Sequence, residues 1–354
     1  MALPLPPVLS PTECAQFGRS FAPYVFSPQL TSLPARIFEA GVTNQDWDTL
    51  KEIYASTNPF VTALTLALIL CPVFVILSEI NRNYSQVDRV WSILPFVYNA
   101  HYAIWARLAG LPASRLDSVA LFTLFWSVRL TFNYWRKGGY KIGSEDYRWG
   151  ILRSYINSRF RFFVFNVLFI GLTQSLLLCF ITAPTYLFVV LAQLPDEGAT
   201  FGIPDLVFSR LLIFFVCIET IADEQQWRFQ RAKQTYQKEN RVPDGFAVED
   251  LERGFVVSGL WSFCRHPNFA AEQAIWLTLY LWASYVTQTP LNWAGVGALG
   301  YLLLFQGSTW LTESISASKY PEYREYQARV GRFIPRFSVE PKKTRKDKSK
   351  KKDT

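Results

Sequence analysis

The chain has 354 residues, half of them hydrophobic, including 29 phenylalanines, 17 tyrosines and 12 tryptophans. Lys and Arg outnumber Asp and Glu by 36 to 28, and the apolar residues are gathered in blocks long enough to cross a bilayer. These properties exclude an ordinary water-soluble protein. The five cysteines show no C-x-x-C spacing and the two histidines lie far apart, which argues against a disulfide framework and against a metal site.

The amino-terminal part, residues 1–59, is rich in proline and in polar side chains. It lacks the basic stretch followed by a compact apolar core that marks a signal peptide. We expect it to form a segment on the lumenal side of a membrane, with the first span acting as the insertion signal. It contains no recognisable chemical motif.

Seven apolar blocks follow, and each is long enough to be a transmembrane helix, which needs about 20 apolar residues. The block 162–194 is longer than one span requires, and Pro184 within it predicts a kink or a break. Two other blocks contain His101, Arg107 and Arg129, so buried helices of a soluble protein remain an alternative for them. The fold class predicted is all-α, a polytopic membrane helix bundle with about seven transmembrane helices. The blocks cover residues 60–78, 90–108, 118–135, 162–194, 204–221, 269–286 and 293–311.

Basic residues alternate between the connecting segments. They are frequent in 136–161, in 223–253 and after 311, and rare or absent in 1–59, 194–203 and 287–292. Basic short loops stay in the cytosol, so residues 79–89, 136–161, 222–268 and the tail should be cytosolic. The predicted organisation is a lumenal segment 1–59, the first three spans in 60–135, a cytosolic loop 136–161, a carboxy-terminal membrane domain 162–336 and a disordered basic tail 337–354.

Two amino-proximal blocks combine charge, aromatic rings and glycine. They read S-Q-V-D-R-V-W-S at 85–92 and N-Y-W-R-K-G-G-Y-K-I-G-S-E-D-Y-R-W at 133–149. Neither matches a phosphate-binding loop or the glycine motif of a dinucleotide-binding fold. For the second block, ligand binding and a basic loop on the membrane surface are equally good interpretations.

Two carboxylates, Glu219 and Asp223, should lie one helical turn apart at the cytosolic end of the block 204–221. At this spacing they repel each other by about 0.2–0.5 kcal/mol unless something bridges them. A ribose hydroxyl, an arginine or a cation would do so. The alternative is that Asp223 only marks the end of the membrane segment.

The most polar boundary of an apolar block is G-L-W-S-F-C-R-H-P-N-F-A-A-E, residues 259–272. Its proline suits the first turn of a helix, which puts Asn268 and Glu272 one turn apart on one face. An amide and a carboxylate so arranged can hold a flat heterocycle with an amide group, such as nicotinamide. Arg265 and His266 would lie at the positive end of that helix and suit a phosphate. The alternative is an ion pair that only orients the helix, because charge at a membrane boundary needs a partner.

The block K-Y-P-E-Y-R-E-Y, residues 319–326, follows the last span. In a short helix Tyr320, Tyr323 and Tyr326 would line one face, and Arg324 would add positive charge. This surface suits the base and the phosphates of a nucleotide, although tyrosines at a membrane interface look similar. We interpret this block and the R-H-P-N block as two walls of one site.

From Lys342 the tail is almost entirely basic and has no apolar face. We expect it to be disordered and attracted to anionic lipid, each charge contributing about 1 kcal/mol near the surface. Nucleic-acid binding is the other common role of such a run, and seven spans argue against it. Lys351 and Lys352 resemble a dilysine retrieval signal, which predicts the endoplasmic reticulum membrane as location and the retrieval machinery as a partner.

Five motifs occur in order between residues 85 and 335: V-D-R-V-W-S-I-L-P, E-D-Y-R-W, A-D-E-Q-Q-x-x-F, R-H-P-N-F-x-x-E and Y-P-E-Y-R-E-Y. Together they resemble the membrane family grouped with the steroid 5-alpha-reductase C-terminal domain, specifically its fungal and bacterial branch of unassigned function. The resemblance implies an endoplasmic-reticulum enzyme that uses NADPH. By it, Asn268 and Glu272 match the pair that engages the nicotinamide amide, and Asp223 matches the aspartate that helps to hold the adenosine part.

The chain also departs from that family. Ala271 stands where the family often has glycine. The glutamate–tyrosine pair that polarises the substrate ketone lies in the early spans of the steroid reductases, and no motif locates it here. The catalytic candidates are therefore Glu79, Tyr98 and His101, with Tyr102 beside them.

The predicted function is NADPH-dependent reduction of a carbon–carbon double bond conjugated to a ketone, in a sterol-like or isoprenoid lipid that enters from the bilayer. The R-H-P block with a later Y-P-x-Y also resembles isoprenylcysteine and phospholipid methyltransferases, which bind S-adenosylmethionine. In those enzymes two glutamates tend to stand where this chain has Thr312 and Glu313. A non-enzymatic lipid-binding or sterol-sensing membrane protein is the third possibility.

Overall fold

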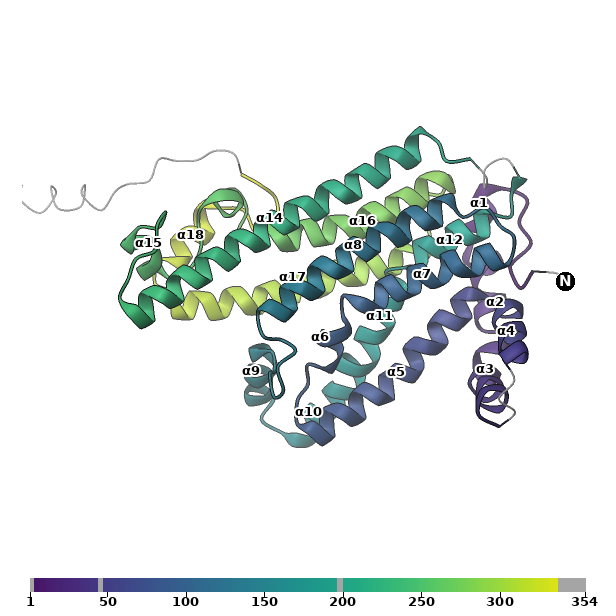
Figure 1. Cartoon of the computed structure of the whole chain (residues 1–354), viewed down its shortest axis with the longest axis horizontal. Helices are drawn as coiled ribbons and strands as arrows, with labels where there is room; N and C mark the ends of the chain where they lie inside the picture. The colour runs from purple at the N-terminus through teal and green to yellow at the C-terminus, as the bar shows by residue number, and fades with distance from the viewer. Residues whose placement is uncertain (1–2, 44–46, 196–199, 337–354) are drawn as a thin grey trace, which may run out of the picture. The chain divides into compact units, whose positions relative to one another are not determined.

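The computed structural model describes residues 3–43, 47–195 and 200–336 (Figure 1). In these ranges the regular elements are helices, and the β-structure is a single bridge between Cys264 and Gly331. The predicted all-α class is confirmed. The chain divides into two compact units: unit 1 is Met1–Val216 with Gln273–Gln306, and unit 2 is Cys217–Glu272 with Gly307–Thr354. The five segments predicted from the charge pattern were defined by the side of the membrane on which each should lie. The two compact units do not report on membrane sides, so these segments stay predictions.

The amino-terminal segment is helical and packs against the rest of unit 1. Its residues Leu5, Cys14 and Phe21 belong to the main hydrophobic core, and α3 contacts α5 (Figure 1). The elements are α1 (Pro11–Cys14), η1 (Phe17–Phe21), α2 (Ala22–Val25), α3 (Pro28–Phe38), η2 (Glu39–Thr43) and α4 (Trp47–Ser56).

Helix α5 (Pro59–Asn81) has clear local reasons for its ends. The side chain of Asn58 accepts a hydrogen bond from the Phe60 amide, and proline occupies the first helical position. Arg82 ends the helix in the left-handed conformation, with φ of 50°. Most of the residues between are apolar, so α5 resembles a membrane-spanning helix in length and composition.

The predicted break in the block 162–194 is confirmed. This stretch consists of α10 (Arg159–Phe165), the π-helical η3 (Asn166–Thr173), α11 (Gln174–Phe180) and α12 (Ala183–Leu191). Pro184 lies in the first turn of α12, where its missing N–H needs no partner. In the π-helical segment, a Cβ on Gly171 would lie 2.5 Å from the side chain of Val75, so the glycine permits a close helix crossing.

The other predicted spans also fall on helices. These are α7 (Ile93–Leu108), α8 (Ser114–Arg136), α14 (Ile203–Glu239), α16 (Pro267–Val286) and α17 (Gly295–Lys319). Within the described ranges, two helical stretches are long and apolar enough to cross a membrane, Pro59–Asn81 and Arg159–Leu191. The coarse architecture is therefore an all-helical protein with two such stretches, and the count of seven crossings is not confirmed.

Unit 1 contains an aromatic core, where α7 and α8 lie side by side (Figure 1). The largest side chains that are fully buried there include Phe60, Trp105, Trp126 and Tyr186. Unit 2 has small cores of its own, one around Phe229, Leu251 and Trp261 and one around Phe255, Tyr323 and Tyr326. Its remaining short elements are α15 (Val248–Arg253), η4 (Gly259–Ser262) and α18 (Tyr323–Arg329).

Candidate functional site

The amino end of α16 brings three of the predicted site residues together within unit 2. Pro267 is the first residue of the helix, as predicted, so Asn268 and Glu272 lie one turn apart. Asn268 Nδ2 donates a hydrogen bond to Asp223 Oδ1, at 3.1 Å, from a position 45 residues further along the chain. Asp223 and Glu272 are both buried, with 5% and 4% of their surface exposed.

The amide oxygen of Asn268 is the least satisfied atom of this group. Asn268 Oδ1 is buried and has no hydrogen-bond partner. Leaving such an atom unpaired costs about 1–3 kcal/mol, a penalty that a bound ligand can remove. Because an amide oxygen only accepts hydrogen bonds, the matching ligand group is an N–H or O–H donor.

Glu219 lies one turn before Asp223 on α14, which confirms the predicted spacing of the acidic pair. Both carboxylates are buried. The indole of Trp261 donates to the carbonyl of Ala222 at 3.2 Å, and Gln225 accepts from the amide of Leu260 at 3.0 Å. These two bonds attach η4, and with it the chain that leads to α16, to the same stretch of α14.

Arg265 and His266 both contact one carboxylate, Glu313 on α17. Arg265 Nε and Nη2 donate to its two oxygens, at 2.7 Å and 3.2 Å. His266 Nε2 lies 2.9 Å from Glu313 Oε1, and all three side chains are buried. The structure thus places Arg265 in an ion pair with Glu313 and His266 in a hydrogen bond with the same carboxylate, and these contacts orient the start of α16, the alternative raised by the sequence. Their role toward a phosphate stays a prediction.

Glu313 is the centre of this network. Burial raises the pKa of its carboxyl, but hydrogen bonds from His266 and Arg265, and their positive charge, outweigh burial and lower the pKa to about 2. Gln327 Nε2 also donates to it at 3.1 Å, and Arg332 lies 3.5 Å away. The prediction of site residues omitted Glu313. The sequence did contain a signal for Glu313, because it is the sole acidic residue of α17. A single charge beside an apolar block needs partners.

A backbone clamp holds the R-H-P segment in place. The amide of Arg265 donates to the carbonyl of Gly331 at 2.8 Å, and the amide of His266 donates to Arg332 at 3.2 Å. Arg265 Nη1 donates to the carbonyls of Gln327 and Val330. The segment before α16 is therefore held by both backbone and side-chain hydrogen bonds to the chain after α18.

The tyrosines of the second predicted wall point into the protein. Tyr323 and Tyr326 are buried and pack on Phe255, with ring centroids 5.0 Å and 5.4 Å from its ring. The hydroxyl of Tyr326 donates to the carbonyl of Trp261. Arg324 is exposed. The expected shared face of these tyrosines is therefore a small core, and the nucleotide-binding role of Tyr323, Arg324 and Tyr326 stays a prediction.

A lysine that the sequence analysis did not select lies beside Tyr320. Lys233 is 8% exposed, and its Nζ donates to the carbonyl of Gly254 at 2.8 Å and to the Tyr320 hydroxyl at 2.9 Å. Burial raises the pKa of Tyr320, but the hydrogen bonds and charges of Lys233 and Lys319 lower it below its ordinary value of 10. Gly254 has φ of 85°, and a Cβ there would lie 2.5 Å from the Tyr320 ring.

The three catalytic candidates of the early spans differ in how they are bonded. Glu79 accepts a hydrogen bond from Asn166 at 3.0 Å and pairs with Arg82 at 3.0 Å. His101 uses both ring nitrogens, with Tyr54 Oη at 2.8 Å and the Pro59 carbonyl at 2.9 Å. These bonds give Glu79 and His101 structural roles, while their catalytic roles stay untested predictions.

Tyr98 is different. It is 1% exposed, yet its hydroxyl has no hydrogen-bond partner among the residues that the structure describes. Tyr102, one turn along α7, is fully buried, and its side chain interacts with Cys179 and Thr182 at the junction of α11 and α12. Further unpartnered hydroxyls on these helices belong to Ser175 and Thr185. Unit 1 therefore holds buried hydroxyl groups, those of Tyr98, Ser175 and Thr185, that no atom of the described residues satisfies.

The two amino-proximal blocks dock onto each other within unit 1. The indole of Trp149 on α9 (Tyr147–Ile156) donates to Asp88 on α6 (Gln86–Val90) at 2.9 Å, and the amide of Asp146 donates to Ser85 Oγ at 2.9 Å. Burial raises the pKa of Asp88 despite the opposing effects of Arg148 and Trp149. These bonds give both motifs a structural role, and ligand binding by the second block stays a prediction.

With the fold and the site described, the chain can be assigned to a class. It belongs to the family DUF1295, a protein family of unknown function, which it matches over residues 73–330. This family is related to steroid 5-alpha-reductase-like proteins, so the predicted resemblance is confirmed at that level. The matched residues include Asp223, Asn268, Glu272 and Glu313.

Among individual proteins, the chain is similar to an uncharacterized protein of the fission yeast Schizosaccharomyces pombe. The two are 38% identical over 339 residues, which cover 95% of this chain and 94% of the yeast protein. No solved structure matches the chain.

Proposed function

We propose that this protein is a membrane oxidoreductase that uses NADPH to reduce a carbon–carbon double bond conjugated to a ketone in a sterol-like or isoprenoid lipid. The observation that carries the proposal is the group formed by Asp223, Asn268 and Glu272. It joins two buried carboxylates to a buried amide oxygen that lacks a partner.

The chemistry of this group fits the carboxamide of nicotinamide. A carboxamide NH2 carries two N–H donors, and the oxygens of Asn268 and Glu272 are acceptors one helical turn apart. Asp223 and Glu219 provide carboxylates of the kind that bind ribose hydroxyls. When bound, NADPH would supply a hydride for the substrate double bond. The basic surface that includes Arg324 is suited to the phosphates.

The substrate side of the proposal rests on Tyr98. Its buried hydroxyl has no protein partner and is free to donate to a ketone oxygen. A fixed donor of this type stabilises the negative charge that develops on such an oxygen during reduction. The surrounding core excludes water, which strengthens this interaction.

We further propose that the protein belongs to the fungal and bacterial branch of the steroid-reductase-like proteins and crosses the endoplasmic reticulum membrane about seven times, with its amino terminus in the lumen. Support comes from the helices found at each apolar block and from the alternation of basic loops. The basic tail, including Lys351 and Lys352, lies outside the residues that the structure describes. Lateral entry from the bilayer would give an apolar substrate access without an aqueous channel.

The test is stabilisation of the purified full chain in detergent micelles by NADPH or by S-adenosylmethionine. A ligand present at 100 times its Kd should stabilise the fold by about 2.7 kcal/mol. We expect this shift with NADPH. A shift with S-adenosylmethionine alone would overturn the reductase proposal in favour of a methyltransferase, and no shift with either would favour a lipid-binding protein.

A pair of variants assigns the effect to the site. Glu272→Gln should weaken NADPH-dependent stabilisation, because one carboxylate acceptor becomes a neutral amide. The matched control is Glu325→Gln on the exposed side of α18, which should leave it unchanged. Equal NADPH affinity in both variants would show that Glu272 does not contribute to NADPH binding.

A further inference from the structure

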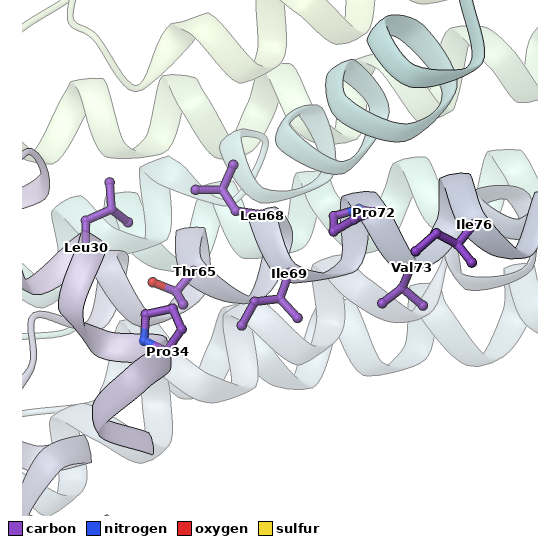
Figure 2. Close-up of a pocket in the computed structure, with 8 residues that line it drawn as sticks. All are labelled: Leu30, Pro34, Thr65, Leu68, Ile69, Pro72, Val73 and Ile76. Atoms are coloured by element: carbon purple, nitrogen blue, oxygen red, sulfur yellow. The ribbon is translucent and has the colours of Figure 1, made fainter. Parts of the chain in front are cut away.

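A groove of about 440 Å³ lies between α3 and α5 in unit 1 (Figure 2). Leu30 and Pro34 of α3 line one side, and Thr65, Leu68 and Pro72 are among the α5 residues that line the other. Its volume is within the range of about 300–1,000 Å³ typical of small-molecule sites. The walls are almost entirely apolar, and none of the lining side chains carries a charge.

One polar side chain breaks this apolar surface. Thr65 is 4% exposed, and its hydroxyl has no hydrogen-bond partner. In Figure 2 the hydroxyl oxygen lies on the side of Thr65 that faces Leu30 and Pro34. A buried hydroxyl without a partner has lost the hydrogen bonds that it would make in water. A ligand in the groove can restore one of them.

The two prolines add acceptors to the same groove. Pro34 lies inside α3 and Pro72 inside α5. Because proline has no N–H, the carbonyl four residues earlier cannot receive its normal helical hydrogen bond. Those carbonyls belong to Leu30 and Leu68, and both residues line the groove. Each wall therefore carries a backbone oxygen that lacks its helical donor.

We propose that this groove binds one lipid molecule from the bilayer, with a rigid apolar body of sterol type and a single hydroxyl group. A ligand hydroxyl can accept from Thr65 and donate to one of the two carbonyls, whereas a ketone can only accept and a hydrocarbon can do neither. A phospholipid headgroup would find no cation among the lining residues.

We infer that the lipid enters the groove from the bilayer, because helix α5 exposes apolar side chains along the groove. Helix α5 is long and apolar enough to cross a membrane, and its groove residues Leu68, Ile69 and Ile76 are 39%, 45% and 56% exposed. The site is separate from the proposed reduction, because it selects a hydroxyl group whereas the proposed substrate is a ketone. The inference therefore stands or falls independently of NADPH binding.

The experiment uses the full chain in phosphatidylcholine nanodiscs that contain a photoreactive, diazirine-bearing cholesterol. Cross-links mapped by mass spectrometry should fall in α3 and α5. Unlabelled cholesterol can make two hydrogen bonds in the groove, so it should compete about 30-fold better than cholestane, which lacks the hydroxyl, at about fivefold for each bond. Cholestan-3-one should be intermediate, because it can accept from Thr65 but cannot donate.

Variants sharpen the result. Thr65→Val keeps the shape of the side chain, so it should reduce the preference for cholesterol over cholestane to about fivefold and abolish that of cholestan-3-one over cholestane, whereas Thr65→Ser should keep both. Leu68→Trp should fill the groove and remove most of the labelling. Cross-links confined to other helices, or equal competition by cholesterol and cholestane on the unaltered protein, would overturn the proposal. The competition on the unaltered protein needs no variant to fold, and NADPH-dependent stabilisation of the same preparation reports separately on the reductase site.

Discussion

The side-chain amide of Asn268 donates to the carboxylate of Asp223, with 3.1 Å between Nδ2 and Oδ1. A carboxylate can only accept, so this bond fixes which end of the amide faces α14. The amide oxygen is left buried and without a partner. A contact between residues far apart in the sequence therefore orients the amide oxygen of Asn268, which is available to accept a hydrogen bond from a ligand.

Replacing this amide should affect both stability and ligand binding. In Asn268→Ala the Asp223 carboxylate loses a donor, which should destabilise the fold by about 1–3 kcal/mol and reduce stabilisation by NADPH. The matched control, Gln237→Ala, removes an exposed amide on α14 and should change stability by less than about 0.5 kcal/mol. Thermal unfolding with and without NADPH measures both effects. Equal behaviour of the two variants would contradict the proposed role.

The Glu313 network should be a major source of stability. Glu313→Gln leaves Arg265 buried without its counter-charge, so the free energy of unfolding should fall by about 3–5 kcal/mol. The control is Glu322→Gln, which removes a surface ion pair with Arg253 at 3.3 Å and should cost less than about 1 kcal/mol. Chemical denaturation of both variants at neutral pH decides the comparison.

The same network predicts that the free energy of unfolding depends on pH in the acidic range. The pKa of Glu313 falls from an ordinary 4.5 to about 2 in the folded protein, so unfolding takes up a proton in this range. Its stabilising contribution is therefore fully present above pH 4.5 and is lost as the pH falls toward 2. Glu313→Gln should flatten this part of the stability profile. A profile as steep as that of the unaltered protein would contradict the assignment.

Tyr98 should behave unlike a structural tyrosine. Its hydroxyl has no partner, so Tyr98→Phe should leave stability unchanged or raise it by about 1 kcal/mol, while reduction of an enone sterol is lost. Tyr186 is the control, because its hydroxyl accepts from Asn58 at 2.9 Å. Tyr186→Phe should lower stability. If Tyr98→Phe is the less stable variant, its hydroxyl has a structural partner after all.

Tyr320 should ionise at a lower pH than an ordinary tyrosine, because Lys233 donates to its hydroxyl. Lys233→Met removes that hydrogen bond and that charge, so the pKa of Tyr320 should rise. Lys238→Met, at an exposed position of α14, should leave it unaltered. Tyrosine Cζ resonances, assigned with Tyr320→Phe, follow the titration. An unchanged pKa in Lys233→Met would show that Lys319 alone causes the shift.

Local sequence signals predicted some of these features well. Proline at the start of α16 and in the first turn of α12 marked a helix start and a break, because proline is best tolerated in the first turn of a helix, where its missing N–H needs no partner. The one-turn spacing of Asn268 and Glu272 followed directly from helical periodicity. These inferences depend only on residues that are close together in the chain, so the sequence alone is sufficient for them.

Other features depend on which helices pack together, and periodicity does not encode that. Glu313 meets His266 across 47 residues, and Lys233 meets Tyr320 across 87. His101 looked catalytic as an isolated residue, but Tyr54 of the amino-terminal segment occupies one of its nitrogens. Rare polar residues in apolar blocks were correctly noticed, but only the tertiary contacts show which of them are already satisfied.

The bridge between Cys264 and Gly331 has a practical consequence for handling the protein. A Cβ on Gly331 would lie 2.1 Å from the carbonyl of Ile334, so even alanine would displace the strand-like pairing. A chain truncated before Gly331 would lose the backbone carbonyls that accept hydrogen bonds from the R-H-P segment. Affinity tags and fluorescent fusions should therefore be attached after Arg336, whose amide still bonds to Phe263 at 3.0 Å.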